Sequence, residues 1–161
     1  MRQHGGRLSD CRDFAIIHGD FCFSNILYDP AAQIARLIDP RGSFGKAGIY
    51  GDPRYDLAKL RHSIAGSYDY IVSDLFRLQQ QGNSFESSLF RNPVQDELCA
   101  FFDRKVSLLG YRIEDIRLIE ALLFFSMLPL HRDHPGRQKM MFLRGLEILN
   151  DQDIMNTEPT L

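Results

Sequence analysis

The chain has 161 residues, and 44% of them are hydrophobic, which is enough for one globular domain with a sizeable core. The 19 basic and 21 acidic residues give a net charge of −2, so the chain lacks the basic excess that nucleic-acid binding requires. The strongest apolar run, residues 121–130, is too short to cross a membrane, and we expect neither a nucleic-acid nor a membrane partner.

The three cysteines, Cys11, Cys22 and Cys99, are widely spaced and form no Cys-x-x-Cys pair. This pattern predicts neither a disulfide framework nor a zinc site, and we expect a reducing, cytoplasmic location. The polar N-terminus, residues 1–13, has no apolar segment of the kind found in secretory signals. We expect a frayed lead-in there.

The front of the chain predicts short strands. We expect strands over residues 14–18, 26–29 and 34–38, with the last two joined as a hairpin. The segment 40–51 contains four glycines and predicts a loop.

After this loop the hydrophobic pattern becomes helical. Asp52 and Pro53 predict a helix start, with the acid as N-cap and the proline at the first position, and this helix is expected to break near Gly66. A polar loop is expected over residues 79–88. Further helices are expected over residues 70–80, 93–109, 114–128 and 137–149.

Short strands followed by a run of helices are typical of an α+β domain. We expect one such domain over residues 14–150, with a small β-hairpin core that carries polar loops and a helical bundle after it. The segment 1–13 leads into this domain, and residues 151–161 are expected to form a loose tail.

Three polar side chains stand at the ends of the predicted strands. Asp20 and Asn25 flank the loop after the first strand, and Asp39 follows the third. If the second and third strands pair as a hairpin, the end of the third returns to the start of the second and brings Asp39 near Asn25. Carboxylate and amide oxygens of this kind suit Mg²⁺.

The stretch from His18 to Asn25 reads HGDFCFSN, and Asp39 follows it across the hairpin. In protein kinases the pattern H-R-D-x-x-x-x-N, followed by a metal-binding Asp, supplies the base for the attacking hydroxyl and the ligands of Mg²⁺. With Gly19 in place of the Arg, the sequence resembles the aminoglycoside phosphotransferase and choline kinase family of small-molecule kinases. The stretch GDPRYDLA, residues 51–58, is similar to the family's segment after the metal-binding Asp.

This resemblance covers residues 14–65 and implies an ATP-dependent transfer of phosphate to a hydroxyl group of a small molecule. It implies that Asp20 is the catalytic base and that Asn25 and Asp39 hold Mg²⁺. Substituting Asp20 by Asn is then expected to abolish turnover while leaving the fold nearly unchanged.

Three further residues belong to this expected site. The resemblance implies that Asp56 braces the catalytic loop, and we expect His18 to orient the loop rather than to carry a proton. Arg41 is a candidate contact for a phosphate or an acidic substrate, with a solvated loop arginine as the alternative.

The family's N-terminal lobe has no counterpart in this sequence. Only thirteen residues precede the first predicted strand, and no Gly-rich loop followed by a Lys-bearing strand is present. The chain resembles the C-terminal lobe of a protein-kinase-like fold alone. We therefore expect little or no kinase activity from the isolated chain, and an apolar face near Phe14 and residues 21–23 that recruits an N-lobe partner chain or drives self-association.

Two other functions are compatible with the same residues. The chain could be a catalytically inactive kinase remnant that serves as a binding module, with Asp20 and Asn25 in an ordinary Asx-turn. It could also be a metal-dependent hydrolase that uses Asp20, Asn25 and Asp39. Integrity of the motif favours the kinase, the missing lobe favours the binding module, and only the acid cluster favours the hydrolase.

Overall fold

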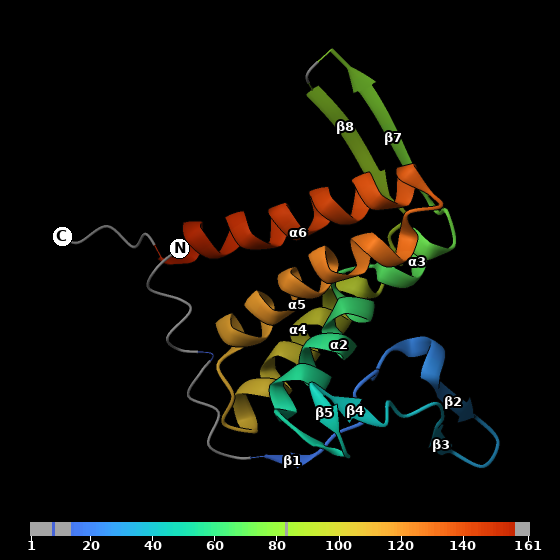
Figure 1. Cartoon of the computed structure of the whole chain (residues 1–161), viewed down its shortest axis with the longest axis vertical. Coiled ribbons are helices and arrows are strands. Elements are labelled where there is room, and N and C mark those ends of the chain that lie inside the picture. Colours follow the sequence, from blue (N-terminus) through green and yellow to red (C-terminus); the bar gives the residue numbers. More distant parts are fainter. Residues whose placement is uncertain (1–7, 9–13, 83, 157–161) are drawn as a thin grey trace.

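The computed structural model describes residues 8, 14–82 and 84–156, and they form an α+β structure in which helices lie beside small sheets (Figure 1). The expected lead-in falls outside the described residues except for Leu8, as do residues 157–161 of the expected tail. Each described sheet has two antiparallel strands. The pairs are β1 (Ala15–Ile16) with β6 (Tyr50–Gly51), β2 (Ile26–Asp29) with β3 (Ile34–Leu37), β4 (Ser43–Phe44) with β5 (Lys46–Ala47), and β7 (Phe76–Gln81) with β8 (Ser84–Leu89).

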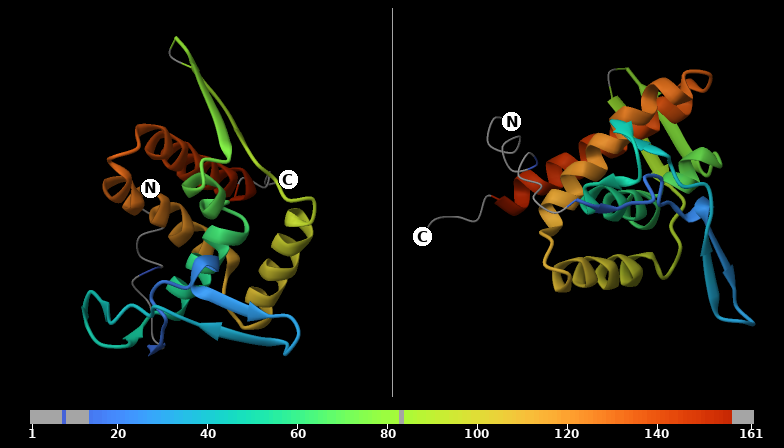
Figure 2. Two further views of the ribbon diagram at one scale, coloured as in Figure 1. Left: turned by 90° about the vertical axis from the view of Figure 1, so that its right-hand side faces the viewer. Right: turned by 60° about the horizontal axis from the view of Figure 1, so that its bottom comes forward.

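Helices make up most of the described chain, and none of the described helices is long and apolar enough to span a membrane. The β2–β3 and β7–β8 hairpins project from opposite ends of the helical region (Figure 2). The helices are α2 (Pro53–Ile64), α3 (Tyr68–Val72), α4 (Gln95–Leu108), α5 (Ile113–Met127) and α6 (Pro135–Asn156), with two 3₁₀ turns, η1 (Phe23–Asn25) and η2 (Leu128–His131).

The hydrophobic core lies in the helices, so the expected β-hairpin core is wrong. One cluster joins α2, α4 and α5, and a second joins α3, α5 and α6. The β2–β3 hairpin contributes to neither: Leu27 and Leu37 are each 53% exposed. Within the described part of the chain no layer covers this hairpin, so its apolar side chains face outward. The members of the two clusters are Ala58, Ile64, Phe102, Val106, Ile116 and Leu123, and Ile71, Ala121, Phe124, Met140, Met141 and Ile148.

The predicted β2–β3 hairpin is confirmed, with Ile26 opposite Leu37. Its turn is held by Asp29, whose Oδ1 accepts hydrogen bonds from the backbone N–H groups of Ala31 and Ala32. Gln33 closes the turn at φ +54°. An Asx turn followed by a left-handed residue is a common way to join two antiparallel strands.

The predicted start of α2 is also confirmed. The Asp52 carboxylate accepts a hydrogen bond from the backbone N–H of Arg54, and Pro53 occupies the first helical position. This cap satisfies one of the backbone donors that a helix start leaves free, and it fixes where the helix begins. The residues that α2 presents to the rest of the chain are therefore set by the cap.

Two predictions between α2 and α4 are wrong. The expected helix over 70–80 ends at Val72, because Asp74 adopts φ +59° and the Leu75 N–H bonds back to the Tyr70 carbonyl, which ends the helix. The expected polar loop over 79–88 is instead the β7–β8 hairpin. The two polar strands flank Gly82-Asn83, a dipeptide typical of tight hairpin turns.

Three smaller differences concern element ends. The expected loop over 40–51 contains β4, β5 and β6, and β6 provides the partner strand that β1 requires. The helix expected from residue 93 begins at Gln95, after the Asn92 side chain has accepted a hydrogen bond from the Val94 N–H. Helix α6 continues to Asn156, past the expected end at 149, and residues 150–156 contain no proline or glycine that would stop it.

A buried charged group joins the helices. The Arg61 guanidinium of α2 bonds to Glu120 of α5, which is fully buried, and to Asp103 of α4 at 2.9 Å. Burial by itself lowers the pKa of Arg61, but the charges of Glu120 and Asp103 outweigh this and raise it. Because a buried charge left without its partner is costly, this group fixes α2 relative to α4 and α5.

His62 makes the stability of this bundle depend on pH. It is fully buried between Tyr68 and Phe124, and burial together with the Lys59 charge lowers its pKa well below 6.5. The unfolded chain then takes up a proton below about pH 6.5 that the folded chain does not, so stability falls as the pH falls.

We predict that His62→Leu removes this pH-dependent part of the free energy of unfolding, which approaches about 1.4 kcal/mol per pH unit. Urea unfolding of both proteins at pH 7 and pH 5 tests it, and equal losses in the two proteins would contradict it.

Candidate active site

The loop between β1 and β2 is closed by Asn25. Its Nδ2 donates hydrogen bonds to the Asp20 backbone carbonyl at 2.8 Å and to the Asp20 carboxylate Oδ2 at 3.3 Å. The backbone N–H of Cys22 bonds to the Asp20 carbonyl, and the N–H of Asn25 bonds to the Cys22 carbonyl. The five-residue spacing of Asp20 and Asn25 thus produces a compact turn in which the two polar side chains touch.

One face of α2 holds this loop at three successive points. The Asp56 carboxylate accepts hydrogen bonds from the backbone N–H groups of His18 at 2.6 Å and Gly19 at 2.8 Å. Lys59 forms an ion pair with Asp20, and the Ser63 hydroxyl accepts the backbone N–H of Phe23 at 3.2 Å. Residues at spacings of three and seven lie on one side of a helix, so α2 works as a template for the loop.

The ion pair between Lys59 and Asp20 is the most asymmetric contact of the site. Nζ of Lys59 lies 2.7 Å from Oδ1 of Asp20, and the lysine side chain is 4% exposed while the aspartate side chain is 33% exposed. The ring of Tyr68 lies 5.8 Å from the ammonium and adds a cation–π contact. Burial, with the nearby Cys22 and Asp20, raises the pKa of Tyr68 to about 12, so this ring stays neutral.

His18 has a structural role in the loop. Its Nδ1 accepts the backbone N–H of Asp20 at 3.3 Å, and its Nε2 lies 2.9 Å from the Ile38 carbonyl oxygen. A carbonyl can only accept, so Nε2 donates and Nδ1 accepts, which assigns the neutral tautomer protonated on Nε2. Both ring nitrogens are occupied by backbone groups, in keeping with an orienting residue.

The segment after β3 runs beside the same loop. The N–H of Ile38 bonds to the Asn25 carbonyl, and the N–H of Arg41 bonds to the His18 carbonyl at 2.7 Å. Asp39 lies between these two anchors, exposed and at φ +56°. The structure therefore brings the backbone of Asp39 next to Asn25, while the direct side-chain contact of the expected trio is the one between Asn25 and Asp20.

The side-chain oxygen atoms of Asn25 and Asp39 suit a magnesium ion that is also coordinated by phosphates. Because Nδ2 of Asn25 is committed to Asp20, its carbonyl oxygen is the atom left for a cation. Asp39 adds one carboxylate, and Mg²⁺ is commonly held by one or two carboxylates together with substrate phosphates and water. Among the described residues, no three His, Cys, Asp or Glu side chains gather in a group that would hold a metal without such help.

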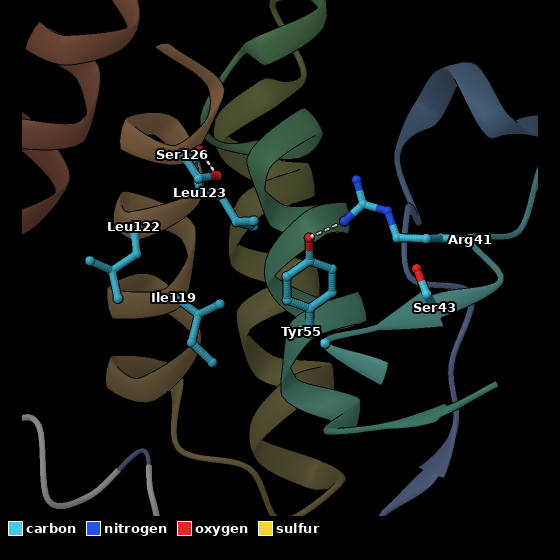
Figure 3. A pocket seen from close by; sticks show the side chains of 8 residues that line it. Arg41, Ser43, Tyr55, Ile119, Leu122, Leu123 and Ser126 are labelled. Carbon is cyan, nitrogen blue, oxygen red and sulfur yellow. Dashed lines mark hydrogen bonds between the residues drawn. The ribbon is translucent and has the colours of Figure 1, made fainter. Parts of the chain in front are cut away.

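Arg41 packs against the loop and extends beyond it. A Cβ placed on Gly19, which has φ +77°, would lie 2.9 Å from Cβ of Arg41, so the glycine permits this close approach. The Arg41 guanidinium reaches the Tyr55 hydroxyl of α2 at 3.4 Å and lines a pocket with residues of α5 (Figure 3).

Sequence reasoning missed Lys59 and Ser63. The sequence feature that could have identified them is their spacing from Asp56. Lys59 and Ser63 follow Asp56 by three and seven residues, and this spacing places all three side chains on one face of the helix. Comparisons of the chain with protein-family models, with curated proteins and with solved structures each found no match.

The ion pair changes the expected behaviour of Asp20→Asn. This substitution leaves the buried Lys59 ammonium without its carboxylate, so we predict a loss of about 2 kcal/mol, less than the 3–5 kcal/mol of a fully buried pair because Asp20 is one-third exposed. The double variant Asp20→Asn/Lys59→Met should recover much of this loss, since it removes the unpaired charge. Urea unfolding of the wild type, both single variants and the double variant gives the coupling directly. Purely additive losses would contradict the pairing.

Asp56 offers an independent test of the template. We predict that Asp56→Ala frees the amides of His18 and Gly19, because their acceptors are the two carboxylate oxygens. Hydrogen exchange at these two amides should quicken by at least about tenfold, while the core of α5 keeps its protection. Unchanged exchange at His18 and Gly19 in a folded variant would show that α2 does not hold the loop.

Proposed function

We propose that this chain is the C-terminal lobe of a small-molecule phosphotransferase of the protein-kinase-like fold, with ATP as phosphoryl donor. The observation that carries the proposal is the hydrogen bonding of the loop. The Asn25 side chain bonds to the Asp20 carboxylate, and the Asp56 carboxylate accepts the two backbone N–H groups that precede Asp20. A turn needs one capping side chain, whereas phosphoryl transfer requires a base and metal ligands held together. The resemblance of the sequence to small-molecule kinases supports the same assignment.

In this proposal the oxygen of an acceptor hydroxyl attacks the γ-phosphorus of ATP, the bond to ADP breaks, and the hydroxyl proton passes to Asp20. The Asp20 carboxylate is partly exposed, so an acceptor can reach it. Lys59 and Asn25 each hold one of its oxygens and so fix its orientation. Such orientation matters because this chemistry depends mainly on positioning and charge stabilisation.

Asn25 and Asp39 are the residues that would hold Mg²⁺, which when bound neutralises charge on the phosphates. Asp39 has a left-handed backbone, a conformation that a non-glycine residue adopts at some cost. The cost is consistent with a side chain that must point in a particular direction.

The exposed apolar side chains around β1 and β2 fit the lobe assignment. Phe14 is 67% exposed and Phe23 is also exposed, while Phe21 is half-buried and Cys22 is buried. An N-terminal lobe, supplied by a partner chain or by self-association, would cover such a surface.

The second candidate is a binding module that no longer turns over. The observation that favours it is the same Lys59–Asp20 ion pair, because a buried lysine requires a counter-ion whether or not the acid does chemistry. Nucleotide-dependent metal binding separates the two, since a module without catalysis has no reason to keep a metal site that depends on phosphates.

We predict that Mn²⁺, used as a paramagnetic substitute for Mg²⁺, broadens the amide signals of Asn25 and Asp39 only when a non-hydrolysable ATP analogue is present. Asp39→Asn should weaken the effect by about tenfold, because one carboxylate is lost from a site that phosphates complete. Asp96→Asn on α4, which also removes one exposed carboxylate, serves as the matched control.

Two outcomes would contradict the proposal. Broadening without nucleotide would indicate a self-sufficient metal site, as a hydrolase requires. Broadening at neither residue with nucleotide present would favour the binding module.

A further inference from the structure

A pocket of about 480 Å³ lies beside the loop, and its two ends differ in chemistry. Leu122, Leu123 and Ile119 of α5 form an apolar wall, and Arg41 stands at the opposite end, with Tyr55 between them (Figure 3). Pockets of this size, largely apolar with a few placed polar groups, are typical of small-molecule sites.

The charge in the pocket is positive. Among the described residues that line the pocket, Arg41 is the one that carries a charge, since the others are apolar, hydroxyl-bearing or glycine. Within the described part of the chain, the Arg41 guanidinium has the Tyr55 hydroxyl as its hydrogen-bond partner and forms no ion pair with a carboxylate. Since the guanidinium carries five N–H donors in a planar fork that matches phosphate and carboxylate groups, most of them remain for a ligand.

The position of Arg41 is fixed by the loop itself. Its backbone N–H bonds to the His18 carbonyl and its Cβ packs on Gly19, directly before Asp20 in the chain. A ligand bound to Arg41 is therefore held at a fixed position relative to the loop that contains Asp20. A solvated surface arginine would need neither the backbone anchor nor an apolar wall across from its side chain.

We propose that this pocket binds a small molecule that carries a phosphate or carboxylate group beside an apolar or ring-shaped body, the anion on Arg41 and the body against Leu122 and Leu123. As the acceptor subsite of a phosphotransferase, which is the part that rests on the proposed function, it selects an acidic acceptor rather than a cationic one. Arg41 is then the residue that determines this specificity.

Phenyl phosphate is a suitable probe because it combines one phosphate with one apolar ring, and its binding to the full chain is measurable by calorimetry without turnover. We expect Arg41→Gln to weaken binding by about tenfold or more, as expected for loss of hydrogen bonds to a charged group. Arg36→Gln, which removes an exposed arginine of β3, is the matched control and should leave binding unchanged. Inorganic phosphate and phenol, each with half of the probe, should bind more weakly.

The apolar wall is tested by Leu122→Asn, with Leu108→Asn on α4 as its control, since both leucines are exposed and neither change disrupts the core. The first should weaken binding of phenyl phosphate and the second should not. Equal binding by Arg41→Gln and Arg36→Gln would overturn the proposal, and so would equal binding of phenyl phosphate and inorganic phosphate.

A competition arm separates the acceptor from the nucleotide as the source of the anion. If the ATP analogue leaves phenyl phosphate bound, the acceptor assignment is supported; if it displaces the probe competitively, that assignment is overturned. The binding of phenyl phosphate requires neither nucleotide nor metal. It therefore tests ligand binding in this pocket independently of the Mn²⁺ experiment, which tests the proposed phosphotransferase function.

Discussion

The candidate site depends on one constraint, the burial of the Lys59 ammonium beneath Asp20. An ammonium removed from water must find negative charge, and Asp20 supplies it from the partly exposed side. The loop cannot move away from α2 without leaving that charge unpaired. The same contact that makes the loop rigid therefore also aims the Asp20 carboxylate.

The helical bundle fixes the position of Lys59 and, through it, the position of the loop. Helix α2 presents Lys59 to the loop, and two residues later it presents Arg61 to Asp103 and Glu120. Ala58, fully buried, packs the same helix into the core. The loop is thus attached to a rigid element rather than to the exposed hairpin that follows it, which is how sites are held within small tolerances.

Part of this arrangement could be predicted from sequence because it is local. The hairpin after the loop, the cap at Asp52 and the approach of Asp20 to Asn25 follow from short-range spacing. The Lys59 pairing could not be predicted in the same way, because it joins residues 39 positions apart and a lysine on a helix is usually solvent-exposed.

The β7–β8 hairpin was missed for another reason. Its strands are polar apart from a few positions, and only Phe76 and Leu89, paired across its base, pack on the core. A hairpin that lies mostly in solvent has little need of apolar alternation, so the pattern that identifies strands was weak. The position of the hydrophobic core was predicted wrongly for a different reason. The apolar residues of the strands near the N-terminus were expected to pack against each other, whereas the core lies between helices.

In the proposed function Asp20 acts as an acid–base group and not only as a counter-ion. The direct measurement is single-turnover transfer of the labelled γ-phosphate of ATP to a hydroxyl acceptor, in an assembly of this chain with an N-terminal lobe in which the Lys59→Met variant transfers measurably. It compares Lys59→Met with the folded double variant Asp20→Asn/Lys59→Met. The two proteins share the loss of the lysine and differ only at Asp20. The account predicts transfer at least about a hundredfold slower in the double variant, the scale of general-base catalysis. Equal transfer by both variants would contradict it.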